Sequence, residues 1–302
     1  MTYAYSFHGL TLSLPFPCPF LPRVETVSAP DVTVVYGPVA RELEHAMATD
    51  DSWAAGYCWQ AAPGRYLLKG GMKSGRFLVE GGTSITLQRN ENAEDKRILF
   101  HLLHPVTAAL FCQRGLLALH ASTAHTPAGT IALCGRSQAG KSTTLAALLQ
   151  KKGCAMVSDD ITIVRCAAHD RVEVVAGSSV MHLWDDAAYG IGLDISGCDR
   201  HPVRRGKAAL TAPSMPSSGA TLLRKLCILE PGTGKIVGVS RVTGADKLDA
   251  LLECVYGPLF QEEHPGLFPL FSATAEQADI FRIRRPESRW SLDDVVSVIL
   301  DA

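Results

Sequence analysis

The chain has 302 residues, of which 47% are hydrophobic and 20% are charged, and its formal net charge is -1. This composition is ordinary for a globular protein with a substantial core, and the length fits one large or two modest domains. The near-zero charge gives no general attraction to nucleic acids or anionic membranes, and no run of about 18 apolar residues exists that could span a membrane.

Nine cysteines are scattered along the chain, and no two of them form a C-x-x-C pair. Their odd number and mostly apolar surroundings argue against a disulfide framework or a zinc site, and favour reduced core residues in a cytoplasmic protein. No charged residue precedes Arg23, and Pro15, Pro17 and Pro19 interrupt the apolar start of the chain, so we expect no signal peptide.

Residues 1–96 are predicted to form a small β-rich domain. Short runs of β-branched and apolar residues, separated by glycines, indicate four strands, at 31–36, 65–69, 76–80 and 84–88. A short helix is expected at 41–48, and the polar segment 90–96 is the expected domain boundary. No residue of this part carries recognisable chemistry, so a docking role and a plain packing role both stay open.

The second predicted domain, residues 97–302, begins with an apolar helix over 98–114, in which Pro105 is a candidate for a kink. His101 and His104 are three residues apart, a separation that could share a metal ion. No carboxylate or cysteine nearby completes a ligand set, so we interpret both as partly buried histidines.

Residues 135–142 read Gly-Arg-Ser-Gln-Ala-Gly-Lys-Ser and fit the phosphate-binding pattern G-x-x-x-x-G-K-[ST], the P-loop. A short apolar run at 130–134 predicts a buried strand before the loop, and leucines at helical spacing predict a helix over 142–150. Strand, loop and helix in this order are what the pattern needs. A glycine-rich turn without a ligand is the alternative.

The P-loop pattern assigns chemistry to its residues. Glycine is expected at both ends because a loop that wraps a triphosphate leaves no room for a Cβ atom. Backbone N–H groups and the positive end of the helix face the anion, Lys141 reaches the outer phosphates, and the Ser142 hydroxyl sits on Mg²⁺. The expected ATP-binding residues are Gly135, Ser137, Gln138, Ala139, Gly140, Lys141, Ser142 and Thr143.

Two further strands flank the P-loop in the sequence. The apolar run at 116–122 contains His120, which in isolation would be interpreted as a hydrogen-bonded core residue. A strand at 154–157 leads to Asp159 and Asp160, and α/β sheets gather their ligands at such strand ends. Without a P-loop nearby, this acid pair could equally well be the start of a turn. Because the P-loop precedes it, we favour a catalytic role for the two acids. Adjacent residues of an extended segment point to opposite sides, so the two acids need not do the same job.

The histidine-containing strand, the segment 131–144 and the segment 156–163 (Met-Val-Ser-Asp-Asp-Ile-Thr-Ile) together resemble the HPr kinase/phosphorylase family. More specifically, the chain is similar to an HPr-kinase-like branch, some members of which occur with the biosynthesis of lasso peptides. The resemblance is specific over residues 98–240 and weaker toward the C-terminus. Further similarity runs through 113–122, 183–186 and 226–232.

The resemblance implies an α/β P-loop kinase domain with a mixed central sheet, related to that of phosphoenolpyruvate carboxykinase, which phosphorylates a serine from ATP. Carried over by position, Asp159 would be the general base and His120 would orient it. Asp160 would bind Mg²⁺ together with Ser142. Positioning and charge neutralisation, including that by Lys141, do most of the work in phosphoryl transfer.

One departure from the family matters. Bifunctional members carry an acidic-Val-Arg-Gly-Leu-Gly signature linked to phosphorolysis, whereas residues 189–194 here read Tyr-Gly-Ile-Gly-Leu-Asp. This puts the phosphorylase activity, and HPr itself as the acceptor, in doubt.

The remaining sequence is less informative. The segment 197–219 is rich in Gly, Pro and Ser and contains Arg204 and Lys207, so it is either a mobile lid over the phosphates or a solvated loop. The other expected elements are a hairpin of 224–230 with 235–239, a helix at 245–256, a strand at 280–284 and a helix at 291–302. The arginine cluster at 282, 284, 285 and 289 is interpreted as a solvated edge.

The sequence therefore predicts an ATP- and Mg²⁺-dependent serine kinase that acts on a peptide or protein, such as a short peptide with a terminal or near-terminal serine. A small-molecule kinase on the same scaffold and a nucleotide-binding regulatory module without transfer activity are the alternatives. The histidine strand and the acid pair favour chemistry, because a regulatory switch needs a magnesium acid but no base. Neither nucleic acid nor membrane is an expected partner, and a homo-oligomer stays open.

Overall fold

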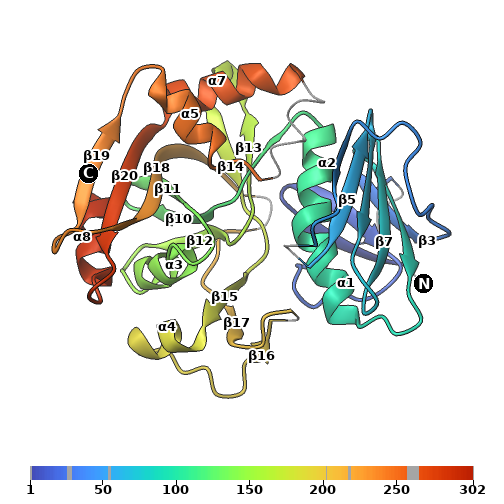
Figure 1. The fold of residues 1–302 in the computed structure, drawn as a ribbon, viewed down its shortest axis with the longest axis horizontal. Coiled ribbons are helices and arrows are strands. Elements are labelled where there is room, and N and C mark those ends of the chain that lie inside the picture. The colour runs from blue at the N-terminus through green and yellow to red at the C-terminus, as the bar shows by residue number, and fades with distance from the viewer. Residues whose placement is uncertain are drawn as a thin grey trace. The chain divides into compact units, whose positions relative to one another are not determined.

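The computed structural model describes residues 2–25, 29–53, 56–201, 203–216, 219–256 and 265–301, and Figure 1 shows its elements. The chain divides into two compact units. Of the described residues, the first unit holds those up to 116 together with 265–267, and the second unit holds 117–256 and 268–301. No helix in these ranges is both long and apolar enough to cross a membrane.

Eight strands among the described residues of the first unit form one sheet, in agreement with the predicted β-rich region. Neighbouring strands pair antiparallel, except that β3 is parallel to both β2 and β8. In spatial order the strands are β1 (Tyr3–Phe7), β2 (Leu10–Leu14), β3 (Val32–Tyr36), β8 (Ser84–Arg89), β7 (Gly75–Glu80), β6 (Arg65–Lys69), β5 (Cys58–Ala62) and β4 (Ala48–Asp50).

The helix expected at 41–48 is not formed. The backbone N–H of Leu43 donates to Gln60 Oε1 at 2.8 Å, and that of Met47 donates to the carbonyl of Ala61 at 2.8 Å. These donors are therefore held by strand β5 and not by carbonyls of their own segment, as a helix would require. The segment then runs directly into β4.

The helix expected over 98–114 forms as α1 (Asp95–His101) and α2 (Thr107–Gln113), joined by the wide π-helical turn Leu102–Val106. Pro105 lies in that turn and has no backbone N–H to donate. The Thr107 hydroxyl donates to the carbonyl of Leu102 at 2.7 Å, which satisfies an acceptor at this irregular turn. The helix therefore widens at the proline and continues.

This helical segment belongs to the first unit, whereas the sequence placed the domain boundary at residue 96. Gln113 Oε1 accepts from the backbone N–H of Gly82 at 2.8 Å, and the Arg114 guanidinium donates to the carbonyl of Gly82 at 2.8 Å. The end of α2 is thus tied to the turn between β7 and β8, and the two units separate only after Leu116.

The second unit is α/β. Its described residues form a nine-stranded sheet of mixed direction and a three-stranded sheet. The large sheet contains β9 (Leu117–Leu119), β10 (Ser122–Thr126), β11 (Gly129–Cys134), β12 (Ala155–Ser158), β13 (Thr162–Cys166), β14 (Val172–Val175), β18 (Ala220–Gly232), β19 (Gly238–Val242) and β20 (Asp279–Pro286). The small sheet contains β15 (Val180–Trp184), β16 (Asp199–Arg200) and β17 (Lys207–Thr211).

Among the described residues, the helices of the second unit are α3 (Lys141–Leu149), α4 (Asp185–Gly190), α5 (Asp246–Leu252), α7 (Phe268–Gln277) and α8 (Leu292–Asp301), with a short 3₁₀ turn at Ala168–Asp170. The 3₁₀ turn at Pro265–Leu267 belongs to the first unit. The helix predicted at 245–256 is thus shorter than expected. The last residue of the helix predicted at 291–302, and positions 202, 217 and 218 of the predicted loop, lie outside the described residues.

Strands β18 and β19 do not pair as the predicted hairpin. Strand β20 lies between them, parallel to β18 and antiparallel to β19. The burial of the strands agrees with this order, since β20 carries the fully buried Ile280 and Ile283, whereas no residue of β19 is buried. Strand β20 therefore takes the inner place, and β19 lies beyond it.

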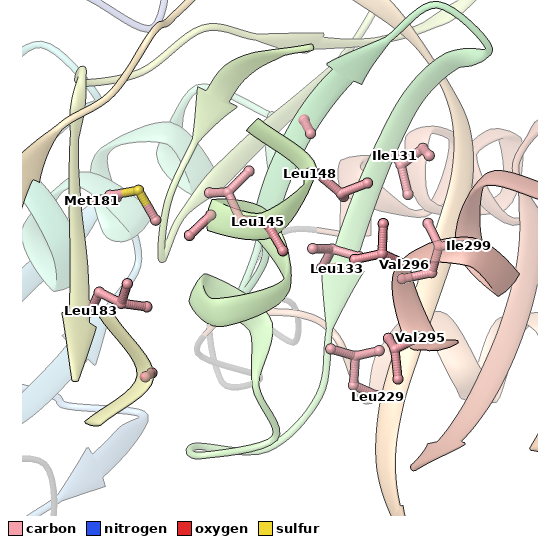
Figure 2. Packing of buried hydrophobic residues seen from close by; sticks show 14 of the residues in the cluster. Ile131, Leu133, Leu145, Leu148, Met181, Leu183, Leu229, Val295, Val296 and Ile299 are labelled. Atoms are coloured by element: carbon pink, nitrogen blue, oxygen red, sulfur yellow. The ribbon is translucent and has the colours of Figure 1, made fainter. Parts of the chain in front are cut away.

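Strand β11 is buried on both faces, and this fixes the position of the loop that follows it. Ile131 and Leu133 belong to one hydrophobic cluster, and the alternating Ala132 and Cys134 belong to a second. Figure 2 shows the leucines of α3 beside β11 and α8 in the first cluster. The loop therefore emerges from a rigid strand and enters a helix whose inner face is covered.

Candidate functional site

The loop at 135–140 joins β11 to α3, as the P-loop pattern predicts. Gly135 has φ 132° and Gly140 has φ 97°, values that favour glycine. A Cβ atom at residue 135 would lie 2.5 Å from the carbonyl oxygen of Leu229 on the adjacent strand β18, whereas at residue 140 the nearest atoms are 3.8 Å away. The first glycine is thus needed for space and conformation, the second for conformation, and both reasons hold before any ligand binds.

Lys141 opens α3 and is buried, with 8% of its surface exposed. Its ammonium group donates to the carbonyl of Gly135 at 2.7 Å and to that of Arg136 at 3.3 Å, so the side chain folds back over the loop. Burial lowers the pKa of Lys141, and the charge of Asp160 acts in the opposite direction. The ammonium group is therefore held by neutral acceptors, which a phosphate oxygen could replace with a charged one.

His120 lies between β9 and β10 and connects Lys141 to Asp160. Its Nδ1 is 3.0 Å from the backbone carbonyl of Asp160, and its Nε2 is 3.2 Å from Lys141 Nζ. A carbonyl can only accept, so Nδ1 carries the proton and Nε2 accepts from the ammonium group. Burial lowers the pKa of His120, with the Asp160 charge opposing this and the Lys141 charge reinforcing it. A neutral imidazole is the form that fits these contacts.

Asp159 is the central hydrogen-bond acceptor of the site. Its Oδ1 accepts from the Ser122 hydroxyl at 2.6 Å and from the Ser142 hydroxyl at 3.0 Å. Its Oδ2 accepts from the backbone N–H of His182 at 3.0 Å. The carboxylate therefore fixes the P-loop serine to strand β10 and to strand β15 of the small sheet.

Asp160 has a different partner. Its backbone has φ 72°, in the left-handed region, and its carboxylate lies 3.4 Å from His120 Nδ1. The left-handed residue turns the chain between β12 and β13 and brings both its carbonyl and its carboxylate to the histidine. The two acids thus make different contacts, but the expected reason, the alternation of side chains along an extended segment, is wrong, because the backbone of Asp160 is left-handed. The expected pairing is not the observed one, because His120 contacts Asp160, whereas Asp159 contacts Ser142.

The outer side of the loop is contacted by two arginines from distant parts of the chain. The guanidinium of Arg204 donates to the Ser137 hydroxyl at 3.4 Å, and that of Arg285 donates to the backbone carbonyl of Gln138 at 3.2 Å. The other predicted loop residues are Ala139, which is buried, and Thr143, which is half-buried in the first turn of α3.

Two contributors to the site were not predicted from the sequence. Ser122 follows the predicted histidine by two residues, and a hydroxyl at the end of an apolar strand was the available signal. His182 contributes only its backbone N–H, so no side-chain signal exists for it. Lys207, which the sequence placed in the candidate lid, begins β17; burial lowers its pKa, and the charges of Asp159 and Asp160 act in the opposite direction.

The sequence allowed two interpretations of the basic segment 197–219, a lid or a solvated loop. The segment folds in part as β16 and β17 of the small sheet. Besides the contact of Arg204 with the P-loop, the ammonium group of Lys207 lies 5.4 Å from the centre of the Trp184 ring. Two of its cations are therefore held at the site by specific contacts.

The donor set suits Mg²⁺ and phosphate, since it combines hydroxyl and carboxylate oxygens with a buried ammonium group. No three His, Cys, Asp or Glu side chains of the described residues gather into a metal-binding group. Magnesium at nucleotide sites is usually held by one or two carboxylates, with phosphates and water completing its shell, so Ser142 and Asp159 fit this ion. No protein-family model matches the chain, and no curated protein matches it either.

Proposed function

We propose that this protein is an ATP- and Mg²⁺-dependent kinase that transfers the γ-phosphate to a serine hydroxyl of a peptide or protein. The observation that carries the proposal is the convergence of Lys141, Ser142, Asp159 and the His120–Asp160 pair where β11 and β12 end. A module that only binds nucleotide has no need of a second carboxylate held by a histidine. The resemblance of the sequence to the HPr kinase/phosphorylase family supports the same reaction.

The phosphates bind to the backbone N–H groups of the loop and to the positive end of α3. Lys141 exchanges its neutral carbonyl acceptors for a phosphate oxygen, which forms a stronger, charge-assisted hydrogen bond. Its burial keeps water away from this contact, so its charge acts on the outer phosphates with little screening.

Mg²⁺ would be held by Ser142 and Asp159, whose oxygens are already hydrogen-bonded to each other. When bound, the ion supplies charge neutralisation for the β- and γ-phosphates. The Ser122 hydroxyl and the His182 N–H fix the Asp159 carboxylate in place. A carboxylate engaged by three donors suits this holding role better than the acceptance of a proton.

Asp160 is the residue that we assign to the serine proton. The serine oxygen attacks the γ-phosphorus, the bond from phosphorus to the bridging oxygen breaks with its electron pair going to ADP, and the serine proton passes to the Asp160 carboxylate. His120 contacts Asp160 through Nδ1 and Lys141 through Nε2. It therefore links the position of the base to the residue that binds the γ-phosphate. This assignment exchanges the roles that the resemblance gave to the two acids.

The acceptor is a flexible hydroxyl, because the serine has to approach in line with the γ-phosphorus. A chain terminus reaches such a position at less conformational cost than a residue inside a helix. The test is mass spectrometry of short peptides with a terminal or near-terminal serine after incubation with ATP and Mg²⁺. We expect an added phosphate that is lost when the serine is replaced by alanine.

Two variants sharpen this test. Lys141→Ala should abolish transfer, whereas Lys151→Ala, which removes an exposed lysine just beyond the other end of α3, should leave it unchanged. Unaltered turnover in Lys141→Ala would remove the P-loop from the mechanism. Labelling of folded HPr without labelling of any peptide would overturn the peptide acceptor. ATP consumption with neither acceptor would favour a small-molecule kinase.

A further inference from the structure

Sheet order defines two sides of the P-loop. Strand β12, which leads to Asp159, lies two strands from β11 on one side, and β20, which carries Arg285 near its end, lies two strands away on the other. Strands β11, β12, β18 and β20 all run in the same direction, so their carboxyl ends meet at one edge. At about 4.8 Å between neighbours, β12 and β20 are about 20 Å apart.

The direction of the triphosphate follows from these two sides if the proposed function holds. Asp159 marks the γ-phosphate side, because it contacts Ser142, the magnesium ligand of the P-loop. The loop itself holds the middle of the triphosphate. The α-phosphate and the nucleoside therefore extend toward β18 and β20, where Arg285 lies.

Arg285 differs from the other arginines near it. Its guanidinium donates to the Gln138 carbonyl at 3.2 Å and lies 3.8 Å from the position that a Cβ atom of residue 140 would take. Its Nε is buried and has no hydrogen-bond partner among the described residues. The neighbouring Arg282, Arg284 and Arg289 instead form ion pairs with Glu230, Glu253 and Asp294.

We propose that Arg285 binds the nucleoside of ATP, with its guanidinium plane stacked on the base. The hydrogen bond to Gln138 uses one edge of the guanidinium, which leaves its planar face for an aromatic ligand. Because that contact exists before the nucleotide binds, little conformational freedom is lost on binding. Glycine at position 140 adds to this arrangement, since it has no side chain to stand between the loop and the guanidinium. The assignment rests on the proposed function.

The test compares ATP with inorganic tripolyphosphate, which has the phosphates but no nucleoside. Calorimetric titrations with Mg²⁺ would use the full chain and the variants Arg285→Gln, Arg285→Lys and, as a matched control on the same strand, Arg284→Gln. Arg285→Gln should weaken ATP binding by about 5- to 30-fold, the range for a cation–π contact, and leave tripolyphosphate within about twofold. Arg285→Lys keeps the charge but not the plane, so it should behave like Arg285→Gln. Arg284→Gln should leave both ligands within about twofold.

Three results would overturn the inference. An equal loss of ATP and tripolyphosphate affinity in Arg285→Gln would place the guanidinium on the phosphates. Full affinity of Arg285→Gln for ATP would show that the side chain does not contact the nucleotide. Restored ATP affinity in Arg285→Lys would show that charge and not stacking matters. Failure of the unaltered chain to bind either ligand would reject the proposed function itself, a result distinct from all three.

Discussion

At the residue scale, the site depends on which atoms the two adjacent aspartates touch. Asp159 accepts hydrogen bonds from Ser122, Ser142 and His182, whereas Asp160 lies against His120. The left-handed backbone of Asp160 separates the two carboxylates. The backbone conformation of one residue therefore gives two identical side chains different roles in the proposed reaction, Asp159 as the magnesium ligand and Asp160 as the proton acceptor.

Exchanging each acid for its amide tests this division. Asp159→Asn should raise the Mg²⁺ concentration needed for activity, because the amide can still bind Ser142 but carries no charge. Asp160→Asn should keep MgATP affinity within a few fold and lose roughly two to four orders of magnitude in transfer, the range for a positioned general base. Magnesium titrations of activity and nucleotide binding measure both. The opposite result would restore the roles that the family resemblance implies.

A buried histidine in the first unit makes a second prediction, on acid stability. His101 is 1% exposed, its Nδ1 is 2.8 Å from the Ser74 hydroxyl, and burial lowers its pKa from 6.5 to about 4. Because the pKa is lower in the folded chain, the unfolded chain binds the proton more readily. The free energy of unfolding that depends on a neutral His101 is therefore fully present above pH 6.5 and is lost as the pH falls to about 4. The loss amounts to about 3 kcal/mol.

Urea unfolding of the first unit, followed between pH 7 and pH 4, measures this effect. His101→Gln removes the titrating group, so the free energy of unfolding of the variant should change less between pH 7 and pH 4. At pH 7 that free energy should be lower in the variant than in the unaltered chain. An identical pH dependence in the variant and the unaltered chain would mean that His101 is not the cause.

At the element scale, the position of the P-loop depends on how α3 is packed. A helix of nine residues is not stable alone in water, so its place is set by the cluster that it shares with β11 and α8. Leu148 is fully buried in that cluster, whereas the adjacent Leu149 is only partly buried. The loop residues that meet the phosphates therefore depend on side chains that never contact a ligand.

Truncating these two leucines tests that dependence. Leu148→Ala should destabilise the second unit by about 2–5 kcal/mol and weaken ATP binding, because the cavity lets α3 shift. Leu149→Ala should cost less and leave nucleotide affinity unchanged. Urea unfolding and nucleotide titration measure the two effects. Equal losses in the two variants would show that Leu148 does not lie on the inner face of α3.

At the scale of the whole molecule, all the site residues belong to the second unit. A ligand that binds only the folded second unit stabilises that unit, by about 2.7 kcal/mol at 100 times its Kd. We expect MgATP to slow amide hydrogen exchange in β11 and α3 and to leave the strands of the first unit unchanged. The Lys141→Ala variant serves as the control and should show no protection. Equal protection of both units would contradict a site confined to the second.

Local patterns in the sequence were sufficient for several parts of this protein. The strand at 130–134, the glycine loop and the helix after it follow from neighbouring residues, because glycine positions and hydrophobic period act over a few residues. The β-rich first region was predicted in the same way. These features require no knowledge of what lies far away in the chain.

Contacts between distant segments were decided only by the tertiary structure. The placing of β20 between β18 and β19, and of α2 on the first unit, depends on which surfaces bury the most apolar area. The choice of Asp160 as the partner of His120 depends on a left-handed residue. The contact of Arg285 with Gln138 joins residues 147 positions apart in the sequence. The adjacent Arg284 instead pairs with a carboxylate, that of Glu230. Sequence spacing does not encode such choices, because they follow from strand order and backbone direction in the folded chain.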